Sequence, residues 1–484
     1  MISIQPKIHD KFSIELKIGY WIKNFSGDSD FTISSWLFIP ESLDLGRDSY
    51  KKELFYRDIK SNVRLITPVY SLEEICKEDS LPFMFLEGAV NEVVMAPSES
   101  NAVEFEHQIK MFGTIYRSAL RNAGDAVLRG DVGNKRNIYL FLGRIDRIIG
   151  RFRDLEKPLK EHEVSKQVLN YFAFCDEFIS LFTENYIFEV ILGLEKKHPF
   201  VFKDFRRSLI KKLEEETAYR KRKGYETADK DSRDKNIKFV YRMGMLKKYM
   251  DSQLFLDSHR KEDGFLARQF YYSLAAGFSM IVATVISFSF QQKYGNFTMP
   301  LFVALVVGYM LKDRIKDLGR FIFSSKLSRR YFDTKRIIGI KNNTVGYIKD
   351  AVDFIPDSGV PEEVMKLRNR SDLFEMTKEA REDILLHRKF VKIDGKILDK
   401  INQYDIAGIH EIMRFNFSRF TQKMDDVEIG IPVPEGEDSF VFLQAEKIYY
   451  LNFVMRLQCG NEITYRRYRL TICQEGIRKL EQMN

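Results

Sequence analysis

The sequence of 484 residues is poor in the residues that build covalent or metal frameworks. Its four cysteines, Cys76, Cys175, Cys459 and Cys473, form no CxxC pair and do not lie at the spacing of zinc ligands. Scattered thiols in a chain of this length are typical of a reducing compartment. The first residues, MISIQPKIHDKF, lack a charged segment followed by an apolar run, so no secretory signal peptide is expected.

The sequence patterns of common catalytic sites are also missing. GxxxxGK(S/T), GxGxxG, GxSxG and HExxH do not occur. The pair His410-Glu411 lacks the second histidine that a zinc site of this type needs. We therefore predict no enzyme activity, no metal and no cofactor, and no nucleic-acid-binding motif is evident.

The composition is that of a folded protein with an excess of positive charge. The chain is 44% hydrophobic and 30% charged, with a formal net charge of +8. Nine Lys/Arg and three Asp lie in residues 312–336, directly after an apolar segment. Positive charge next to an apolar segment indicates a membrane surface rather than nucleic acid.

Two long uncharged runs, separated by Lys293, are the strongest feature of the sequence. Gln269–Gln292 has no charged residue, and neither has Tyr294–Leu311. About 20 helical residues span a bilayer core of about 30 Å. Residues 266–311 are therefore predicted to form a transmembrane hairpin of two antiparallel helices.

Small and charged residues refine this prediction. Small residues should allow close helix contact and self-association of the hairpin; they are Gly277, Ser279, Ala304 and Gly308. Basic residues flank the hairpin on both sides: Arg260, Lys261, Arg268, Lys312, Arg314, Lys316 and Arg320. The turn carries only Lys293, so the positive-inside rule predicts an inner-membrane protein with two spans and both termini in the cytoplasm.

The turn between the two runs resembles that of a known channel family. Tyr294-Gly295-Asn296-Phe297, followed by Met299-Pro300, resembles the YGMNF…MPE turn of CorA-type magnesium channels. The resemblance covers only the hairpin; the methionine between Gly295 and Asn296 is missing, and Leu301 replaces the acidic residue. It implies a divalent cation channel with a ring of first spans.

The fold class predicted from the whole chain is an α+β multidomain integral membrane protein. Its transmembrane hairpin lies between an N-terminal mixed strand and helical-bundle region and a C-terminal α+β domain. The predicted parts are a small β-rich region (1–100), a cytosolic helical bundle (101–235), a helix leading into the membrane (236–265), the hairpin (266–311), a basic juxtamembrane segment (312–336) and a cytosolic α+β domain (337–484).

Hydrophobic periodicity predicts individual helices. Two stripes at helical spacing are Phe105, Ile109, Phe112, Tyr116 and Leu120, and Ile138, Phe141, Ile145, Ile148 and Phe152. The apolar run from Val168 to Leu194 contains Asp176 and Glu177, which predicts a buried bundle helix and not a third span. No proline lies between Pro199 and Pro300, so a nearly continuous helix from Ile237 to Phe290 is expected.

The end of the chain predicts a β-hairpin with a candidate binding site. Gly460-Asn461 is a typical two-residue turn, which places Cys459 opposite Glu462 and Phe453 opposite Tyr468. This register puts four residues on one face: Arg456, Tyr465, Arg467 and Arg469. Three guanidinium groups beside an aromatic ring suit an acidic or phosphate ligand, and a solvated face with acidic neighbours is the alternative.

These features together predict a membrane-anchored cytosolic sensor, scaffold or effector without a catalytic site. Its predicted partners are the lipid bilayer and further copies of the hairpin. A CorA-like divalent cation channel and a membrane-tethered protein that binds a nucleotide or phospho-ligand are the alternative functions.

Overall fold

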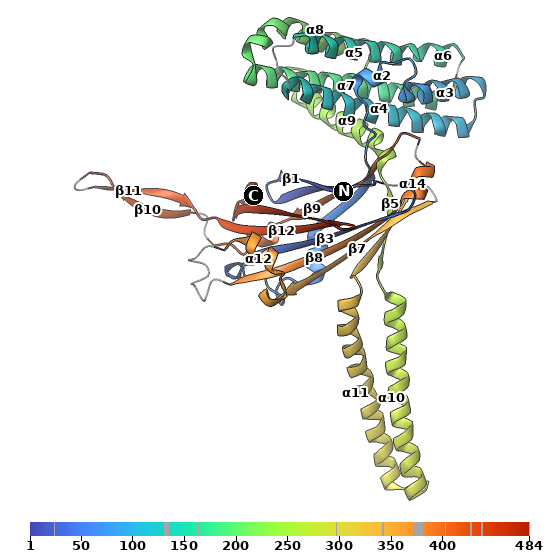
Figure 1. Ribbon diagram of the computed structural model, residues 1–484, viewed down its shortest axis with the longest axis vertical. Helices are drawn as coiled ribbons and strands as arrows, with labels where there is room; N and C mark the ends of the chain where they lie inside the picture. Colours follow the sequence, from blue (N-terminus) through green and yellow to red (C-terminus); the bar gives the residue numbers. More distant parts are fainter. Residues whose placement is uncertain are drawn as a thin grey trace. The chain divides into compact units, whose positions relative to one another are not determined.

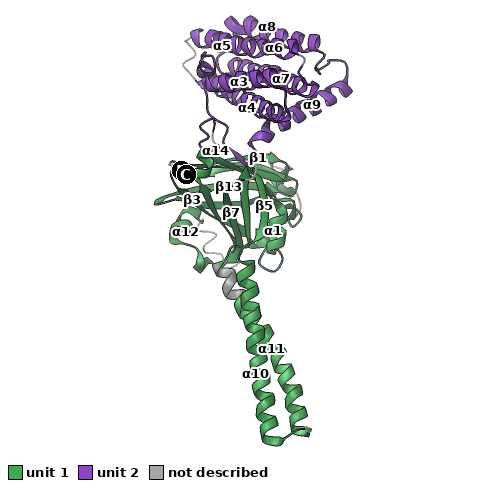
Figure 2. Cartoon of the chain, turned by 90° about the vertical axis from the view of Figure 1, so that its right-hand side faces the viewer, with its two compact units in different colours: residues 1–63, 256–401, 409–484 green, residues 64–255, 402–408 purple. Residues whose placement is uncertain are grey.

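The computed structural model describes the chain except residues 24, 130–134, 163, 297, 341–342, 371–380, 402, 426–427, 437–438 and 484, and the side chains of 135, 324–330 and 401. The chain divides into two compact units (Figure 2). Unit 1 contains residues 1–63, 256–401 and 409–484, and unit 2 contains residues 64–255 and 402–408.

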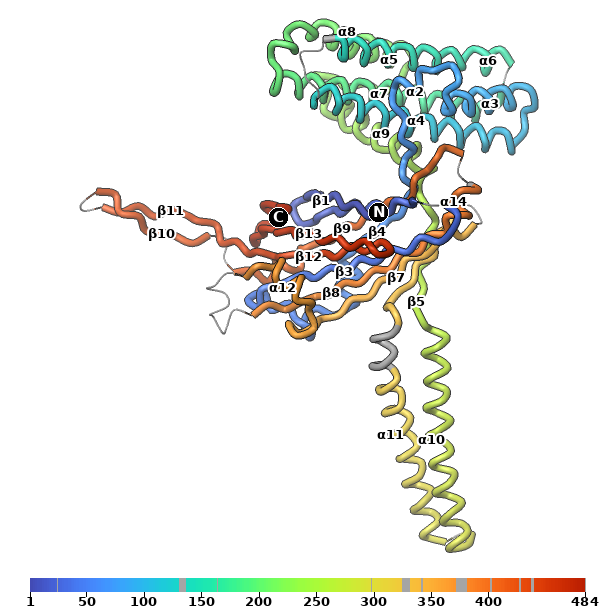
Figure 3. Tube along the Cα trace, viewed as in Figure 1, coloured from blue at the N-terminus to red at the C-terminus, as the bar shows by residue number. Residues whose placement is uncertain are grey.

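Unit 1 is built on an eight-stranded sheet that joins distant parts of the sequence (Figures 1 and 3). In spatial order its strands are β14 (Gly476–Met483), β13 (Glu462–Cys473), β12 (Tyr449–Cys459), β3 (Asp28–Pro40), β8 (Glu382–Asp394), β7 (Asn343–Ile355), β6 (Thr334–Ile340) and β5 (Asp257–Glu262). The N-terminal strand β3 thus lies between two C-terminal strands. Regions that the sequence suggested as separate share one sheet.

A four-stranded sheet packs against the larger one. Its order is β1 (Ile2–Asp10), β2 (Ser13–Trp21), β9 (Gly408–Asn416) and β4 (Ile59–Leu65). Ile14 and Leu16 of β2 and Met413 of β9 meet Leu37 of β3 and Phe453 of β12 around a small apolar cavity. The core of unit 1 therefore lies between the two sheets, as in other layered β structures.

Short helices and one separate hairpin complete the β part of unit 1. The helices are α1 (Lys52–Asp58), α12 (Glu362–Arg368), α14 (Gly395–Ile401) and α15 (Ser418–Thr421), with 3-10 turns at Glu41–Leu43 and Asp357–Gly359. The strands β10 (Glu428–Pro434) and β11 (Phe440–Glu446) pair only with each other among the described residues.

The predicted register of the terminal hairpin is confirmed. Cys459 pairs with Glu462 and Phe453 with Tyr468. Gly460, in the turn, has a φ of +58°, which glycine adopts without a steric penalty.

Unit 2 is a bundle of helices. They are α2 (Leu72–Ile75), α3 (Leu81–Met95), α4 (Glu99–Arg129), α5 (Lys135–Asp154), α6 (Glu156–Glu161), α7 (Lys166–Lys197), α8 (Pro199–Lys223) and α9 (Arg233–Asp251), followed by a 3-10 turn at Ser252–Leu254. Both predicted apolar stripes are buried, the first in α4 and the second in α5. The run from Val168 to Leu194 lies within α7 as predicted.

Acidic residues of α7 are buried because basic residues of other helices neutralise them. Arg153 of α5 contacts Asp176 at 3.2 Å, and Arg242 of α9 contacts Glu177 at 2.7 Å. Buried carboxylates are tolerated only when they are paired in this way.

The expected continuous helix from Ile237 to Phe290 is wrong. The helix α9 ends at Asp251, and β5 pairs with β6 before the next helix begins. Gly264, with a φ of +68°, makes the turn from β5 into α10 (Phe265–Tyr294). Helical periodicity cannot reveal this interruption, since the strand is formed by pairing with residues more than 70 positions away.

The predicted two-helix transmembrane hairpin is also wrong. The helices α10 and α11 (Met299–Arg330) do pack side by side, but in the described part of the chain only α10 is long and apolar enough to cross a membrane. The reason is the composition of α11, whose apolar part ends at Leu311. At a rise of 1.5 Å per residue, Met299–Leu311 is about 20 Å long and too short for a core of about 30 Å.

The contact between α10 and α11 uses small residues, as predicted. Ser279 and Ala304 are buried, and Gly308 lies against Ala283. Gly277 instead faces open space.

Candidate functional site

The predicted arginine site is assembled on one face of the eight-stranded sheet. Arg456 of β12 lies opposite Tyr465 of β13. Arg467 lies opposite Val454, and Arg469 lies opposite Asn452. Because β12 residues at every second position point to the same side, the four predicted residues share one face. We call Arg456, Tyr465, Arg467 and Arg469 the arginine face.

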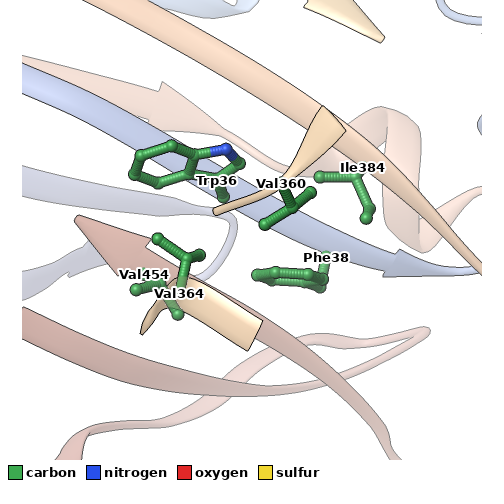
Figure 4. Close-up of a cluster of buried hydrophobic side chains, with 6 residues drawn as sticks. All are labelled: Trp36, Phe38, Val360, Val364, Ile384 and Val454. Atoms are coloured by element: carbon green, nitrogen blue, oxygen red, sulfur yellow. The ribbon is translucent and has the colours of Figure 1, made fainter. Parts of the chain in front are cut away.

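An apolar cluster, whose side chains are drawn in Figure 4, borders the arginine face at Tyr465. It contains Trp36, Phe38, Val360, Val364, Ile384 and Val454, and Tyr465 packs against it. Val364 belongs to α12, so this helix covers the apolar part of the sheet face. The aromatic ring of Tyr465 is therefore fixed by packing beside the guanidinium groups.

Among the described residues, the arginine face has more positive charge than its neighbours neutralise. Burial, followed by repulsion from Arg368 and Arg469, holds the pKa of Arg467 below its ordinary value. Arg469 contacts Glu481 at 3.2 Å. The Nε atoms of Arg456, Arg467 and Arg469 are buried and have no hydrogen-bond partner in the described part of the chain. Such donors are favourable only when an acceptor reaches them.

A second group of charges, which sequence reasoning missed, lies between the two sheets of unit 1. Lys389 of β8 contacts Glu411 of β9 at 2.5 Å and Asp350 of β7 at 3.2 Å. Arg336 of β6 contacts the same two carboxylates at 2.7 Å and 3.2 Å. His387 Nε2 lies 3.1 Å from Asp350 Oδ1. We call these five residues the buried charge cluster.

Hydroxyl groups complete the hydrogen bonding of Glu411. Its Oε2 accepts a hydrogen bond from Tyr20 at 3.0 Å, and its Oε1 accepts one from Ser61 at 2.5 Å. Burial next to Glu411 raises the pKa of Tyr20 well above its ordinary value, so this hydroxyl stays a donor. Glu411 is fully buried and has no exposed side-chain area.

The cluster holds both carboxylates in the ionised form. Burial opposes ionisation of Glu411, but Lys389 and Arg336 hold its pKa below the ordinary value. Burial likewise opposes ionisation of Asp350, whose pKa is lowered by Lys389, by the hydrogen bond from His387 and by Arg336. These carboxylates raise the pKa of Arg336 against the effect of burial.

A cavity of about 180 Å³ opens beside the cluster. It is lined by Phe55, Tyr56, Ile59, Ser61, Arg260, Thr334, Arg336, Asp350, His387 and Lys389.

The alternation of buried and half-buried residues along β8 is a sequence signal that could have revealed this site. His387 and Lys389 lie two residues apart, on the same face as the buried Leu385 and Val391. A charged residue on the buried face of a strand requires a partner.

The pair His410-Glu411 is divided between the two faces of β9. Only Glu411 joins the buried charge cluster, while the ring of His410 lies 6.1 Å from that of Trp21. Across the described ranges, no group of three or more His, Cys, Asp or Glu residues is arranged to hold a metal ion.

A third feature is the apolar surface of α10 and α11. Large apolar side chains are exposed along both helices up to the turn between them; they include Phe278, Met280, Ile281, Val285, Phe288, Phe302, Val303, Val306, Val307 and Met310. A continuous surface of this kind is rare on a monomeric soluble protein and marks a contact with protein or lipid. Phe297, in the turn, lies outside the described residues.

The fold and these sites define a protein with an α+β unit that carries a long helical pair and with a second, all-helical unit. No protein-family model, no curated protein and no solved structure matches the chain.

Proposed function

We propose that the chain is a membrane-anchored protein in which the apolar end of α10 and α11 enters a lipid bilayer from one side. The observation that carries the proposal is the exposed apolar surface near the turn. Phe288 of α10 is 65% exposed and Phe302 of α11 is 62% exposed. Transfer of such surface from water is worth roughly 25 cal/mol per Å².

The arrangement of charge supports shallow insertion. Gly308 of α11 lies against Ala283 of α10, and Gly319 lies against Ala275. Lys312, where the charged part of α11 begins, is therefore level with the middle of α10. The pair is apolar on both helices only over about 20 Å, which is less than the hydrocarbon core. The turn then lies within the bilayer, and the long stem of Lys293 carries its ammonium toward a headgroup region.

Residues at the boundary of the apolar part suit a lipid headgroup region. Lys312 Nζ lies 4.0 Å from the centre of the Tyr309 ring. Tyrosine rings and the long stems of lysines are favourable at this depth, because one end is apolar and the other reaches water. Self-association of the apolar surfaces is the competing explanation.

Both ends of the helical pair return to the same sheet. The strand before α10 is β5, the strand after α11 is β6, and the two pair directly. The basic residues on both flanks favour the cytoplasmic leaflet. We propose that the protein is a sensor, scaffold or effector at this surface, with no catalytic role.

Vesicle flotation tests the proposal. The double variant Phe288→Asp/Phe302→Asp should lose flotation with vesicles of phosphatidylcholine and phosphatidylglycerol, because charges in hydrocarbon are costly. The control Phe200→Asp, at a side chain 89% exposed in unit 2, should float like the wild type. Self-association would be favoured if the wild-type protein forms a soluble assembly of fixed size and does not float with vesicles.

A second candidate function is binding of an acidic or phosphate ligand at the arginine face. The observation that favours it is the set of three buried Nε atoms without acceptors among the described residues. Arginine forks bind phosphate and carboxylate with two parallel hydrogen bonds. The CorA-like channel has less support, since the turn offers Lys293 and no carboxylate to attract cations.

A further inference from the structure

Two arginines of neighbouring strands face the same cavity. Arg260 of β5 lies directly opposite Arg336 of β6, and both line the 180 Å³ cavity beside the buried charge cluster. Like charges directly opposite each other on paired strands are destabilising. Arg260 is exposed, so water screens part of this repulsion, and a negative group between the two arginines would remove the rest.

The carboxylates in the described part of the chain do not neutralise both arginines. Asp350 and Glu411 are shared by Arg336 and Lys389, at distances of 2.5–3.2 Å. Arg260 has no ion pair among the described residues. Its guanidinium carbon lies 4.7 Å from the centre of the Tyr56 ring. Three cations thus face two carboxylates.

Two further carboxylates of the described residues, Glu262 and Asp333, are engaged by other partners. Glu262 lies two residues after Arg260 and opposite Thr334, and its carboxylate is 3.5 Å from Arg268. Asp333, beside the cavity, accepts hydrogen bonds from Tyr56 and Lys52.

The hydrogen-bonding capacity of the cavity is also unbalanced. Oδ1 of Asp350 accepts from His387 and Lys389, and Oδ2 accepts from Arg336. An arginine has five N–H donors, so Arg260 and Arg336 together offer more donors than these acceptors use. An acceptor that carries negative charge would use the remaining donors of both arginines.

We propose that this cavity is a binding site for a phosphate group, which is held between Arg260 and Arg336. A phosphate presents oxygens on opposite sides and accepts from two arginine forks at once, whereas a carboxylate presents one edge. Phe55 and Ile59 provide apolar contact for the atoms attached to the phosphate. The source is either a free phosphate compound or a phosphomonoester lipid headgroup.

The test uses tryptophan fluorescence of the full-length protein. The chain has two tryptophans, Trp21 and Trp36, and both belong to unit 1. Thermal unfolding is followed at increasing inorganic phosphate, with chloride at equal ionic strength as reference. The background Arg467→Gln/Arg469→Gln removes the contribution of the arginine face. We expect the midpoint to rise with phosphate and to saturate.

Substitutions of Arg260 test whether the phosphate-dependent rise of the unfolding midpoint comes from binding at the cavity. Arg260→Gln should raise the half-saturating phosphate concentration about tenfold or more, because it removes one fork. Arg260→Lys, which keeps the charge, should have an intermediate effect. The control Arg466→Gln removes an exposed arginine of unit 1 that does not line the cavity, and it should leave the midpoint shift unchanged.

Vesicles distinguish the two sources. A midpoint shift with free phosphate indicates a soluble ligand. A shift that needs vesicles with phosphatidic acid, is absent with pure phosphatidylcholine and is lost in Arg260→Gln indicates a headgroup; either result supports the site. No shift with either probe, or an equal shift in Arg260→Gln, overturns it. The first measurement does not depend on membrane anchoring.

Discussion

Lys389 Nζ and Glu411 Oε1 lie 2.5 Å apart and join β8 of the large sheet to β9 of the small sheet. Both side chains are at most 2% exposed. The two sheets are therefore held together by a buried ion pair as well as by apolar packing. Removal of one partner from such a pair leaves an uncompensated buried charge, which typically costs 3–5 kcal/mol.

We predict that Glu411→Gln lowers the free energy of unfolding of unit 1 by about 3–5 kcal/mol. Urea unfolding followed by tryptophan fluorescence measures this quantity, because both tryptophans lie in unit 1. The control is Asp28→Asn, which breaks the half-exposed pair with Lys392 near the C-terminal end of β8 and should cost at most about 1 kcal/mol. Equal losses in both variants would contradict a special role for the buried pair.

The buried charge cluster also predicts acid sensitivity. The pKa values of Asp350 and Glu411 are lowered in the folded protein, so the unfolded chain binds protons first as the pH falls. Their stabilising contribution is complete above the ordinary carboxylate range and is lost progressively as the pH falls from about 4 toward the lowered folded-state pKa values. The free energy of unfolding, measured from pH 7 to pH 3, should fall more steeply in the wild type than in Glu411→Gln. If the free energy of unfolding had the same pH dependence in both proteins, the buried charge cluster would not be the cause of the acid sensitivity.

For the arginine face we predict that substitutions abolish ligand binding but hardly change the free energy of unfolding. Arg467 is repelled by Arg368 and Arg469, so Arg467→Gln should change the free energy of unfolding by less than about 0.5 kcal/mol. The double variant Arg467→Ala/Arg469→Ala should lose binding of a fluorescent nucleotide, and Arg466→Ala serves as the control. Arg466 lies opposite Met455, on the other face of β13. Unchanged nucleotide binding in the double variant would mean that the arginine face is only a solvated surface of the sheet.

Local patterns in the sequence predicted the features that depend on neighbouring residues. The register of the terminal hairpin follows from the two-residue turn at Gly460-Asn461, and the stripe with Phe105 and Ile109 follows from helical periodicity. The arginine face was predicted as a group for the same reason, although its ligand stays a prediction. Such features need information only from within one element or one hairpin.

Features that depend on distant pairing were missed. Arg260 and Arg336 lie 76 positions apart, and only the pairing of β5 with β6 brings them together. Lys389 and Glu411 belong to different sheets. The two-span prediction failed for another reason, since it treated Tyr294–Leu311 as a span although the apolar part of α11 is only about 20 Å long.

The channel alternative makes a separate prediction. We expect purified protein in liposomes to show no constitutive magnesium uptake, because the turn has Lys293 and no carboxylate. Asn296 accepts a hydrogen bond from Gln291 at 2.8 Å, so Asn296→Ala should affect only the local turn. A magnesium-sensitive dye inside the vesicles measures uptake. Robust uptake that disappears in Asn296→Ala would favour the CorA-like channel.

The last prediction concerns the depth of the turn. One-sided insertion places Asn296 inside the hydrocarbon, whereas two complete spans would expose it on the far side of the membrane. An environment-sensitive fluorophore is attached to Asn296→Cys after replacement of the half-buried Cys76 and Cys459. We expect its emission to report an apolar environment, and quenchers attached to lipid tails should reduce it.

A label at Lys316→Cys provides the matched comparison on the same helical pair. Lys316 lies in the charged part of α11 and contacts Asp313 at 3.2 Å, so its label should stay accessible to a water-soluble quencher added outside the vesicles. The label at position 296 should resist this quencher on both sides of the membrane, because the apolar part of α11 is shorter than the hydrocarbon core. Quenching of the turn label by reagent enclosed in the vesicles would mean that the helical pair reaches the far surface, and shallow insertion would be wrong.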